Sequence, residues 1–289
     1  MKFGFIEAEK ACHSIELMCE VLGVSRSGFY AWRTRKPSRR ALEDELIRDN
    51  VVDIFHRKGG KYGSPRLKGE KGLEKVGRHR IARILREESL CARQKRAFRV
   101  ATTDSNHQEQ VPENLLARDF SASRPNEKWV GDITYLPTRT GFIYLAVLLD
   151  LHSRRVVGWS MSNSLHTDLA LEALNVALAT RHIEGQLLHH TDRGVQYVSH
   201  SYVERIEQCG IQRSMSRKGN CWDNAPAESF FSSLKMELPA VASGRLEARE
   251  VRRAVLDYLE WYNLERKHSA VGNISPAQYE NAARMGRAA

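Results

Sequence analysis

Three carboxylates stand at positions in this sequence where a charge is costly. Asp132 interrupts a strand-like run, Asp192 ends a short apolar run, and Glu228 lies next to a pair of phenylalanines. A buried carboxylate is unfavourable unless it is paired or coordinates a metal. If these three converge, they offer oxygen ligands to a hard divalent cation such as magnesium, which proteins hold with carboxylates and phosphate oxygens. The residue types therefore point to phosphodiester chemistry.

Each carboxylate also has an ordinary structural explanation. Asp132 could protect an edge strand, Asp192 could cap a turn or a helix, and Glu228 could lie on a solvated helix face. Together, however, these explanations require three coincidences in a chain that also carries a strongly basic front half. We therefore prefer a shared site.

The surrounding pattern predicts an α/β domain that positions the three carboxylates. Strands are predicted at 129–136, 142–149, 154–160, 187–191 and 211–215, and helices at 167–180, at 199–209 and around Glu228. This order describes a mixed five-stranded sheet with helices on its faces. Neighbouring strands lie about 4.8 Å apart, so Asp132 and Asp192 could share one metal or flank two.

Basic residues near Glu228 are candidates for contact with DNA. Lys235 follows Glu228 by seven residues, which is two helical turns, so both side chains share a face and Lys235 could hold a phosphate. Arg217 and Lys218 lie in a glycine-bearing loop before Glu228, and loops near active sites often contact the substrate. In two-metal phosphoryl transfer, one ion activates the attacking oxygen and the other stabilises the leaving oxygen.

Charge is distributed unevenly along the 289 residues. The formal net charge is +10, of which residues 1–128 carry +9 (27 Lys and Arg against 18 Asp and Glu) and residues 129–289 only +1 (18 against 17). This asymmetry indicates a front half that binds a polyanion, although a merely soluble basic surface is the alternative.

The front half is predicted to hold two small helical units. Residues 1–36 show a helix-turn-helix-like pattern, in which Ser25 can cap the second helix and Arg26 lies near its start. Residues 37–92 form a second helical DNA-binding (helix-turn-helix) unit, whose last helix is predicted to contact DNA through Arg78, Arg80 and Arg83. An ordinary helical hairpin and a solvated helix face are the alternatives.

The rest of the chain is predicted as a linker and one large domain. Residues 93–124 form a basic and polar linker, and residues 125–285 form the catalytic core with its C-terminal helices. The five cysteines are scattered and odd in number, which argues against a disulfide framework or a cysteine zinc site. No segment has the length and apolarity of a membrane span or the pattern of a signal peptide. We expect a cytoplasmic protein that associates with the nucleoid when it is bound to DNA.

In combination, these residues resemble the second-reading-frame (orfB-type) transposases of bacterial insertion sequences, which carry a retroviral-integrase-like DDE core. The matching motifs are Trp129-Val130-Gly131-Asp132, His190-Thr191-Asp192-Arg193-Gly194, Asp223-Asn224-Ala225-Pro226-Ala227-Glu228 and the tail Ser275-Pro276-Ala277. Between Asp192 and Glu228 lie 35 residues (193 to 227), the spacing of this family's acidic triad, and Lys235 falls at its basic position.

The resemblance implies an RNase H-like fold and an enzyme that cleaves insertion-sequence ends and transfers the strand to target DNA. Asp132, Asp192 and Glu228 would be both the catalytic residues and the ligands of two magnesium ions, for which manganese could substitute. Water and then a DNA 3′-hydroxyl would be the nucleophiles. The partners would be the inverted-repeat ends and target DNA, further copies of the chain on that DNA, and an upstream-frame protein, separate or joined by a frameshift. No zinc module is implied, because Cys12, His13 and Cys19 have the wrong spacing.

Two other functions are compatible with parts of the sequence. A sequence-specific DNA-binding regulator would explain the helical units and the charge, but it would leave the three carboxylates without a task. An RNase H-type nuclease would use the carboxylates without joining DNA. A cleavage and joining assay distinguishes these hypotheses.

Overall fold

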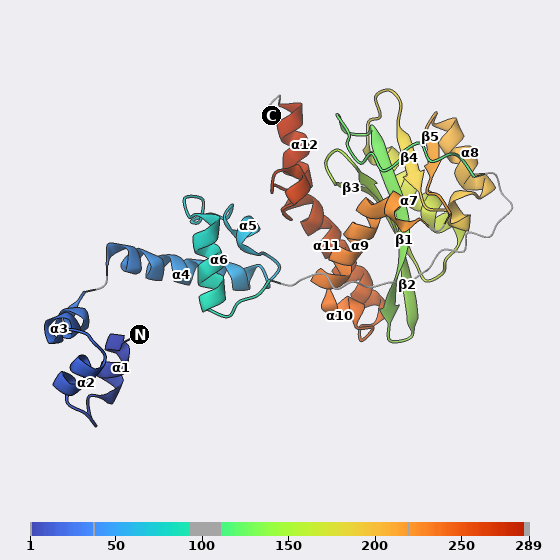
Figure 1. The fold of residues 1–289 in the computed structure, drawn as a ribbon. Helices are drawn as coiled ribbons and strands as arrows, with labels where there is room; N and C mark the ends of the chain where they lie inside the picture. Colours follow the sequence, from blue (N-terminus) through green and yellow to red (C-terminus); the bar gives the residue numbers. More distant parts are fainter. Residues whose placement is uncertain (1, 37, 93–110, 219, 286–289) are drawn as a thin grey trace.

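The computed structural model describes residues 2–36, 38–92, 111–218 and 220–285, with a helical front half and an α/β back half (Figure 1). The front half contains α1 (Lys2–Glu9), α2 (Ile15–Val21), α3 (Arg26–Thr34), α4 (Arg39–Arg57), α5 (Ser64–Leu67) and α6 (Arg78–Glu87). The back half contains β1 (Lys128–Thr138), β2 (Gly141–Asp150), β3 (Val156–Ser162), α7 (Thr167–Thr180), β4 (Leu188–Thr191), α8 (His200–Gln208), β5 (Gln212–Met215), α9 (Ala225–Glu237), α10 (Pro239–Ala242), α11 (Ala248–Leu264) and α12 (Pro276–Arg284).

The five strands form one sheet in the order β3-β2-β1-β4-β5. β1, β2 and β3 are antiparallel neighbours, whereas β4 runs parallel to β1 and β5 runs parallel to β4. This mixed sheet with flanking helices is the predicted RNase H-like arrangement. The prediction of fold class is therefore confirmed.

Helices cover both faces of the sheet, which explains the nearly continuous apolar run of β2. On one face, α9 and α11 pack in a cluster that includes Val147, Leu234 and Val255. On the other face, α7 and α8 pack in a cluster that includes Leu148 and Ala173. α7 approaches β3 so closely that a Cβ atom at Gly158 would lie 2.2 Å from the carbonyl oxygen of Ala173, so this position requires glycine.

The first helical unit has a small core in which Ile6, Met18, Cys19 and Phe29 are buried. The predicted cap is confirmed, because the Gly28 N–H donates to Ser25 Oγ at 3.0 Å. The pattern also predicts that Tyr30 and Trp32 point inward, but this is wrong: they are 47% and 40% exposed. In a unit this small, a single large side chain such as Phe29 fills the space between the helices.

The second helical unit has its own core and also contacts the back half of the chain. The Lys267 N–H donates to Tyr62 Oη at 3.2 Å, and Lys267 Nζ lies 2.7 Å from a Glu70 carboxylate oxygen. Lys61 Nζ lies 4.4 Å from the centre of the Trp261 ring, which is a cation–π contact. These contacts fix the unit beside the end of α11.

The predicted linker is described only in its last part. Residues 93–110 lie outside the described residues. Residues 111–124 lie along the α/β domain, where Leu116 is 1% exposed and the backbone N–H groups of Leu115 and Leu116 donate to Ser214 Oγ at 2.9 and 3.2 Å. Asn114 and Arg118 in this segment reach the segment before α9, described below. No helix in the described parts of the chain is long and apolar enough to cross a membrane.

Candidate active site at the ends of β1 and β4

The sheet brings two of the predicted carboxylates to one place. β1 and β4 are parallel neighbours, and Gly131 is paired with Thr191 in their register. Asp132 and Asp192 each come directly after one member of this pair. They therefore lie at the same height on adjacent strands, as the sequence predicts.

Asp132 is half-buried, with little to compensate its charge. Its Oδ1 accepts the N–H of Ile133 at 2.8 Å. Among the described residues, no arginine or lysine nitrogen lies within 4 Å of its carboxylate oxygens. Burial raises the pKa of Asp132 well above its ordinary value, and the neighbouring Asp192 and Glu228 raise it further. Asp192 and Glu228 therefore lie within electrostatic range of Asp132.

Glu228 is delivered to this place by the first turn of α9. A proline at the start of the helix suits the position, since it has no N–H to leave unpaired. The buried Asn224, at the N-cap, donates from Nδ2 to the carbonyl oxygen of Gly131 at 3.1 Å, which ties the start of α9 to β1 next to Asp132. The Glu228 side chain is exposed. Partial burial of its carboxyl group and the charge of Asp192 raise the pKa of Glu228.

Lys235 lies on the same helix and faces the same site. Its Nζ is 4.8 Å from the centre of the Tyr135 ring on β1. Burial lowers the pKa of Lys235, and the charge of Asp132 acts in the opposite direction. The predicted shared face of Glu228 and Lys235 therefore places a cation beside Asp132, close enough to act on its carboxylate without forming an ion pair.

The turn after β4 fixes Asp192. The N–H of Gly194 donates to Asp192 Oδ1 at 3.0 Å, and a Cβ atom at position 194 would lie 3.1 Å from that oxygen. Tyr197, in the short 3₁₀ turn that follows, is 3% exposed. Burial raises the pKa of Tyr197 well above its ordinary value, and the charges of Asp192 and Asp132 add to this effect. The Tyr197 hydroxyl is therefore uncharged and buried near Asp192 and Asp132.

The chemistry of the donor set fits a hard divalent cation, because three carboxylates supply oxygen ligands and Asp132 has no compensating cation in contact. Within the described residues, no group of three or more His, Cys, Asp or Glu side chains is already arranged as a metal site. Binding an ion would thus require the side chains to adjust from these positions.

The two histidines before Asp192 are structural. His189 Nε2 lies 2.7 Å from Tyr202 Oη, and the ring nitrogens of His190 lie 2.8 and 3.1 Å from the hydroxyls of Ser214 and Ser216. Burial lowers the pKa of His189 to about 3 and that of His190 to about 4. Both rings are therefore neutral at physiological pH and satisfy buried hydroxyl groups.

Arg217, predicted to contact DNA, lies before α9 and is bound to Asp223. The fully buried Asp223 carboxylate accepts from Arg217 Nε at 2.9 Å and Nη2 at 2.8 Å, and also from Arg118 Nε at 2.9 Å. Hydrogen bonds from Arg217 lower the pKa of Asp223. The Arg217 side chain is still 55% exposed, and Lys218 beside it is exposed.

Of the four arginines predicted to contact DNA in the front half, three are ion-paired with carboxylates in the described part of the chain and one, Arg78, is not. Arg80 and Arg83 on α6 both bind the Asp44 carboxylate on α4, which offsets part of their charge. Arg26 on α3 lies 2.8 Å from a Glu16 oxygen at the exposed surface. Arg78, at the start of α6, is exposed and has no ion-pair partner among the described residues.

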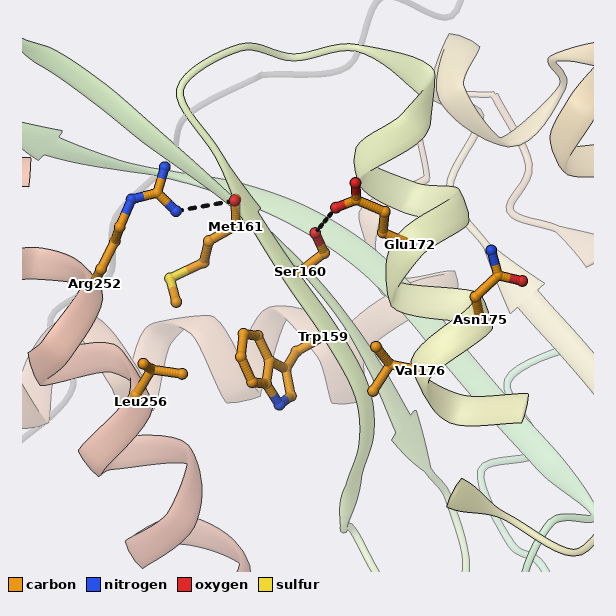
Figure 2. A pocket seen from close by; sticks show the side chains of 8 residues that line it. All are labelled: Trp159, Ser160, Met161, Glu172, Asn175, Val176, Arg252 and Leu256. Carbon is orange, nitrogen blue, oxygen red and sulfur yellow. Dashed lines mark hydrogen bonds between the residues drawn. The ribbon is translucent and has the colours of Figure 1, made fainter. Parts of the chain in front are cut away.

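A groove of about 560 Å³ lies elsewhere on the domain, along the edge strand β3 between α7 and α11 (Figure 2). Arg252 donates to the carbonyl oxygen of Met161, and Ser160 donates to Glu172, across its floor. β2 separates β3 from β1 in the sheet, so this groove is distinct from the carboxylates. Its lining combines apolar side chains such as Trp159 and Leu256 with one carboxylate, Glu172, which is already bonded to Ser160.

Comparison with known proteins identifies the family. A model described as an integrase core domain matches residues 122–221, a second integrase core model matches residues 209–276, and an HTH-like domain model matches residues 41–98. Transposase InsF for insertion sequence IS3A of Escherichia coli (strain K12) is 44% identical over 289 residues, covering 97% of this chain and 99% of InsF. The chain belongs to the InsF family of insertion-sequence transposases.

Other similar proteins include a protein of another insertion element and a viral assembly. The insertion element IS600 uncharacterized 31 kDa protein of Shigella sonnei is 42% identical over 267 residues, covering 91% of this chain and 97% of that protein. A simian T-cell lymphotropic virus intasome structure aligns with a TM-score of 0.47 at 19% identity, covering 80% of this chain and 74% of that one. Membership of the InsF family makes the chain a transposase, a polynucleotidyl transferase with an integrase core, and its HTH-like domain indicates DNA as its partner.

Sequence reasoning missed two residues beside the candidate site, Asn224 and Arg118. Asn224 ties α9 to β1, and Arg118 binds the buried Asp223. The signal for Asn224 is its position directly before the Ala225-Pro226 helix start, where asparagine is a common cap. Arg118 has no such local signal, because it meets Asp223 across 105 residues of chain.

Proposed function

We propose that this transposase cleaves insertion-sequence ends and joins them to target DNA at Asp132, Asp192 and Glu228. The observation that carries the proposal is the position of Asp132 beside Asp192 at the ends of parallel neighbours, with its charge uncompensated and Glu228 and Lys235 directed to it from α9. Water and then a DNA 3′-hydroxyl act as the nucleophiles, each attacking a phosphodiester in line with the leaving oxygen. No covalent intermediate with the protein is required.

The three carboxylates would hold divalent cations, two magnesium ions in the expected arrangement, with manganese able to substitute. When bound, such ions would supply activation of the attacking oxygen and stabilisation of the leaving oxygen. Asp132 and Asp192 provide the fixed ligands, because strand backbone and the turn at Gly194 hold them. Glu228, at the rim, completes the site as DNA is bound. Lys235 holds a phosphate of the substrate beside Asp132.

The front half would hold the DNA ends. Arg78 is the strongest candidate for a phosphate or base contact, since it is exposed and lies in the first turn of α6. Arg80 and Arg83 both bind Asp44, so they hold α6 against α4 and also add positive potential at this surface. Arg26 takes the equivalent place on α3, and Arg217 and Lys218 contact the strand that enters the site.

Transposition brings two DNA ends together, so we propose that several copies act as a homo-multimer on DNA. We also propose an upstream-frame protein as a separate partner or a frameshift fusion, and a cytoplasmic location with association to the nucleoid. Contact between the second helical unit and α11 supports action by the whole chain, because DNA bound by that unit lies at a fixed place relative to α9.

A joining assay tests the proposal. Purified full-length protein is incubated with a labelled duplex that carries the element end with a free 3′-hydroxyl, with target plasmid and with Mg²⁺. We expect labelled strands to become joined to the plasmid, and we expect EDTA or a scrambled end sequence to abolish the joined product. Hydrolysis without joining across metal and salt conditions would instead identify a nuclease, and binding without either product would identify a regulator.

A further inference from the structure

Trp222 is the most unusual exposed side chain near the active site. It lies in the 3₁₀ turn Cys221–Asn224, directly before α9, and is 68% exposed. The next residue, Asp223, is fully buried. A large aromatic ring turned to solvent gains nothing from packing, so an exposed ring next to a buried anchor suggests a surface that a ligand covers.

The segment that carries Trp222 is fixed to both strands of the site. At its start, the Ser216 N–H donates to the carbonyl oxygen of Thr191 at 2.9 Å, and Arg193 Nε donates to the Ser216 carbonyl oxygen at 2.7 Å. At its end, Asn224 is bonded to Gly131. Thr191 and Gly131 immediately precede Asp192 and Asp132. The two ends of this segment, Ser216 and Asn224, are therefore anchored beside the strand positions that carry the carboxylates.

Two arginines bind Asp223, the residue that follows Trp222, and Asp223 determines how they are presented. Arg217 and Arg118 bind the same carboxylate through one side of each guanidinium, and their side chains remain 55% and 44% exposed. Among the described residues, neither Arg118 Nη1 nor Arg217 Nη1 has a hydrogen-bond partner. One buried carboxylate thus fixes two positive groups with donors facing solvent, an arrangement suited to a phosphate.

An exposed aromatic ring on the same short segment as fixed guanidinium groups is a combination that suits unpaired nucleotides, because the ring can stack on a base while the cations contact the backbone. We propose that Trp222 stacks on an unpaired base of the DNA strand next to the scissile phosphate, and that Arg118 and Arg217 bind a phosphate of the same strand. This inference rests on the proposed function and adds to it a preference for a strand that is opened at the cleavage point.

An abasic-site cycle tests the stacking. Wild type and Trp222→Ala are compared in the joining assay on end DNA with a normal base and on DNA with an abasic site, moved one position at a time near the cleavage point. At one position we expect the abasic site to lower wild-type DNA binding and joining by about tenfold to a hundredfold. We expect Trp222→Ala to lose a similar factor on normal DNA and to lose nothing further on that abasic DNA. Trp222→Phe should restore most of the difference.

The controls separate stacking from other effects. Trp222 is exposed, so thermal unfolding of Trp222→Ala should match wild type. Leu256→Ala, an exposed apolar residue at the opposite edge of the sheet, should join normally on every DNA. Equal losses for Trp222→Ala on normal and abasic DNA at all positions would overturn the inference, and so would full activity of Trp222→Ala. Wild-type joining of normal DNA in the same experiment would leave the proposed function standing; absence of wild-type joining would count against the function itself.

The phosphate contact has its own test. Arg118→Gln keeps the Arg217–Asp223 pair and removes one cation, so the dependence of DNA binding on salt should fall by about one counterion. Arg139→Gln, which removes an exposed arginine paired with Glu247, is the matched control and should leave the slope unchanged. An unchanged slope for Arg118→Gln would exclude the phosphate contact.

Discussion

Glu280 and Asp132 both carry a carboxylate into the α/β domain, but only Glu280 meets arginines there. Glu280 on α12 is 1% exposed and accepts hydrogen bonds from Arg181 at 2.8 and 2.9 Å and from Arg155 at 2.7 Å. Burial penalises its charge, but the hydrogen bonds from the arginines outweigh this penalty and lower the pKa of Glu280. At Asp132 burial is not offset, and the pKa is raised.

This difference separates structural from functional carboxylates better than burial does. Glu280 is neutralised within the chain, and so is Glu237 at the end of α9, which accepts from Arg266 Nη2 at 2.8 Å and from Tyr258 Oη at 2.8 Å. Both attach C-terminal helices to the core. Asp132 and Glu228 form no ion pair within the described residues, which agrees with the proposal that they are ligands of a catalytic metal.

Substitutions in the triad should have the largest effect. Asp132→Asn, Asp192→Asn and Glu228→Gln each remove a proposed metal ligand while preserving size, and each should lower the rate of joining by about a thousandfold or more. DNA binding and folding should be preserved, as measured by fluorescence anisotropy and circular dichroism. Full joining activity in all three variants would show that the site is misplaced.

Glu280→Gln should lower stability and leave joining activity intact, the reverse of the triad substitutions. The substitution removes the closest carboxylate from the buried Arg181 and leaves only Asp150, at 3.6 Å, as its anionic partner, so the free energy of unfolding should fall by about 3 kcal/mol. Chemical denaturation at neutral pH measures this change, with Glu260→Gln on the exposed side of α11 as the control. A folded Glu280→Gln variant should still join DNA; a selective loss of joining with unchanged stability would contradict the structural role.

Lys235→Ala should have an intermediate effect on function. Removal of one charge-assisted phosphate contact should lower the rate of joining by about tenfold, and Lys235→Arg should recover part of this loss. Single-turnover assays with Mg²⁺ measure the difference. Unchanged joining in Lys235→Ala would remove this residue from the site.

The smallest expected effect is that of Asp132→Asn on stability. It should stabilise the fold, whereas Glu280→Gln should destabilise it. The pKa of Asp132 is higher in the folded chain than its ordinary value of 3.8, so ionisation of this group destabilises the fold as pH rises through the raised pKa. Below about pH 4 this cost is absent. At neutral pH without divalent metal, Asp132→Asn should therefore gain about 1 kcal/mol of stability.

Thermal unfolding across pH checks this sign. The advantage of Asp132→Asn over wild type should shrink as pH falls toward 4. Asp257→Asn, on the exposed face of α11, should show no such trend. A loss of stability in Asp132→Asn at neutral pH would mean that its charge is compensated within the chain.

The sequence predicted the parts that depend on local pattern. The apolar run of β2 and the alternation in β1 gave strands that differ from the observed ones by one or two residues at each end. The shared site of Asp132 and Asp192 was predicted from their places at strands, although the strand order that puts β4 beside β1 was not, and the position of Lys235 followed from helical periodicity. These features are determined by neighbours in sequence or by the general rules of strand connection.

The rest depends on contacts between distant residues. Asp44 neutralises Arg83 across 39 residues, and Tyr62 meets Lys267 across 205, so no local pattern indicates either contact. Similarly, Arg217 reads as a free loop cation in sequence but is bound to Asp223 in the fold. Burial of Asp223 beside an exposed Trp222 could not be predicted either, because Asp223 is held by Arg118, which lies 105 residues away in the chain.

Metal binding is the most direct test of the contrast between Asp132 and Glu280. Mn²⁺ is titrated into the full-length protein bound to end DNA, and free Mn²⁺ is measured by electron paramagnetic resonance for wild type, Asp132→Asn and the control Asp257→Asn. Wild type and Asp257→Asn should bind Mn²⁺ in competition with Mg²⁺, whereas Asp132→Asn should lose that binding. Equal Mn²⁺ binding by Asp132→Asn and wild type would contradict the assignment of this carboxylate to a catalytic metal.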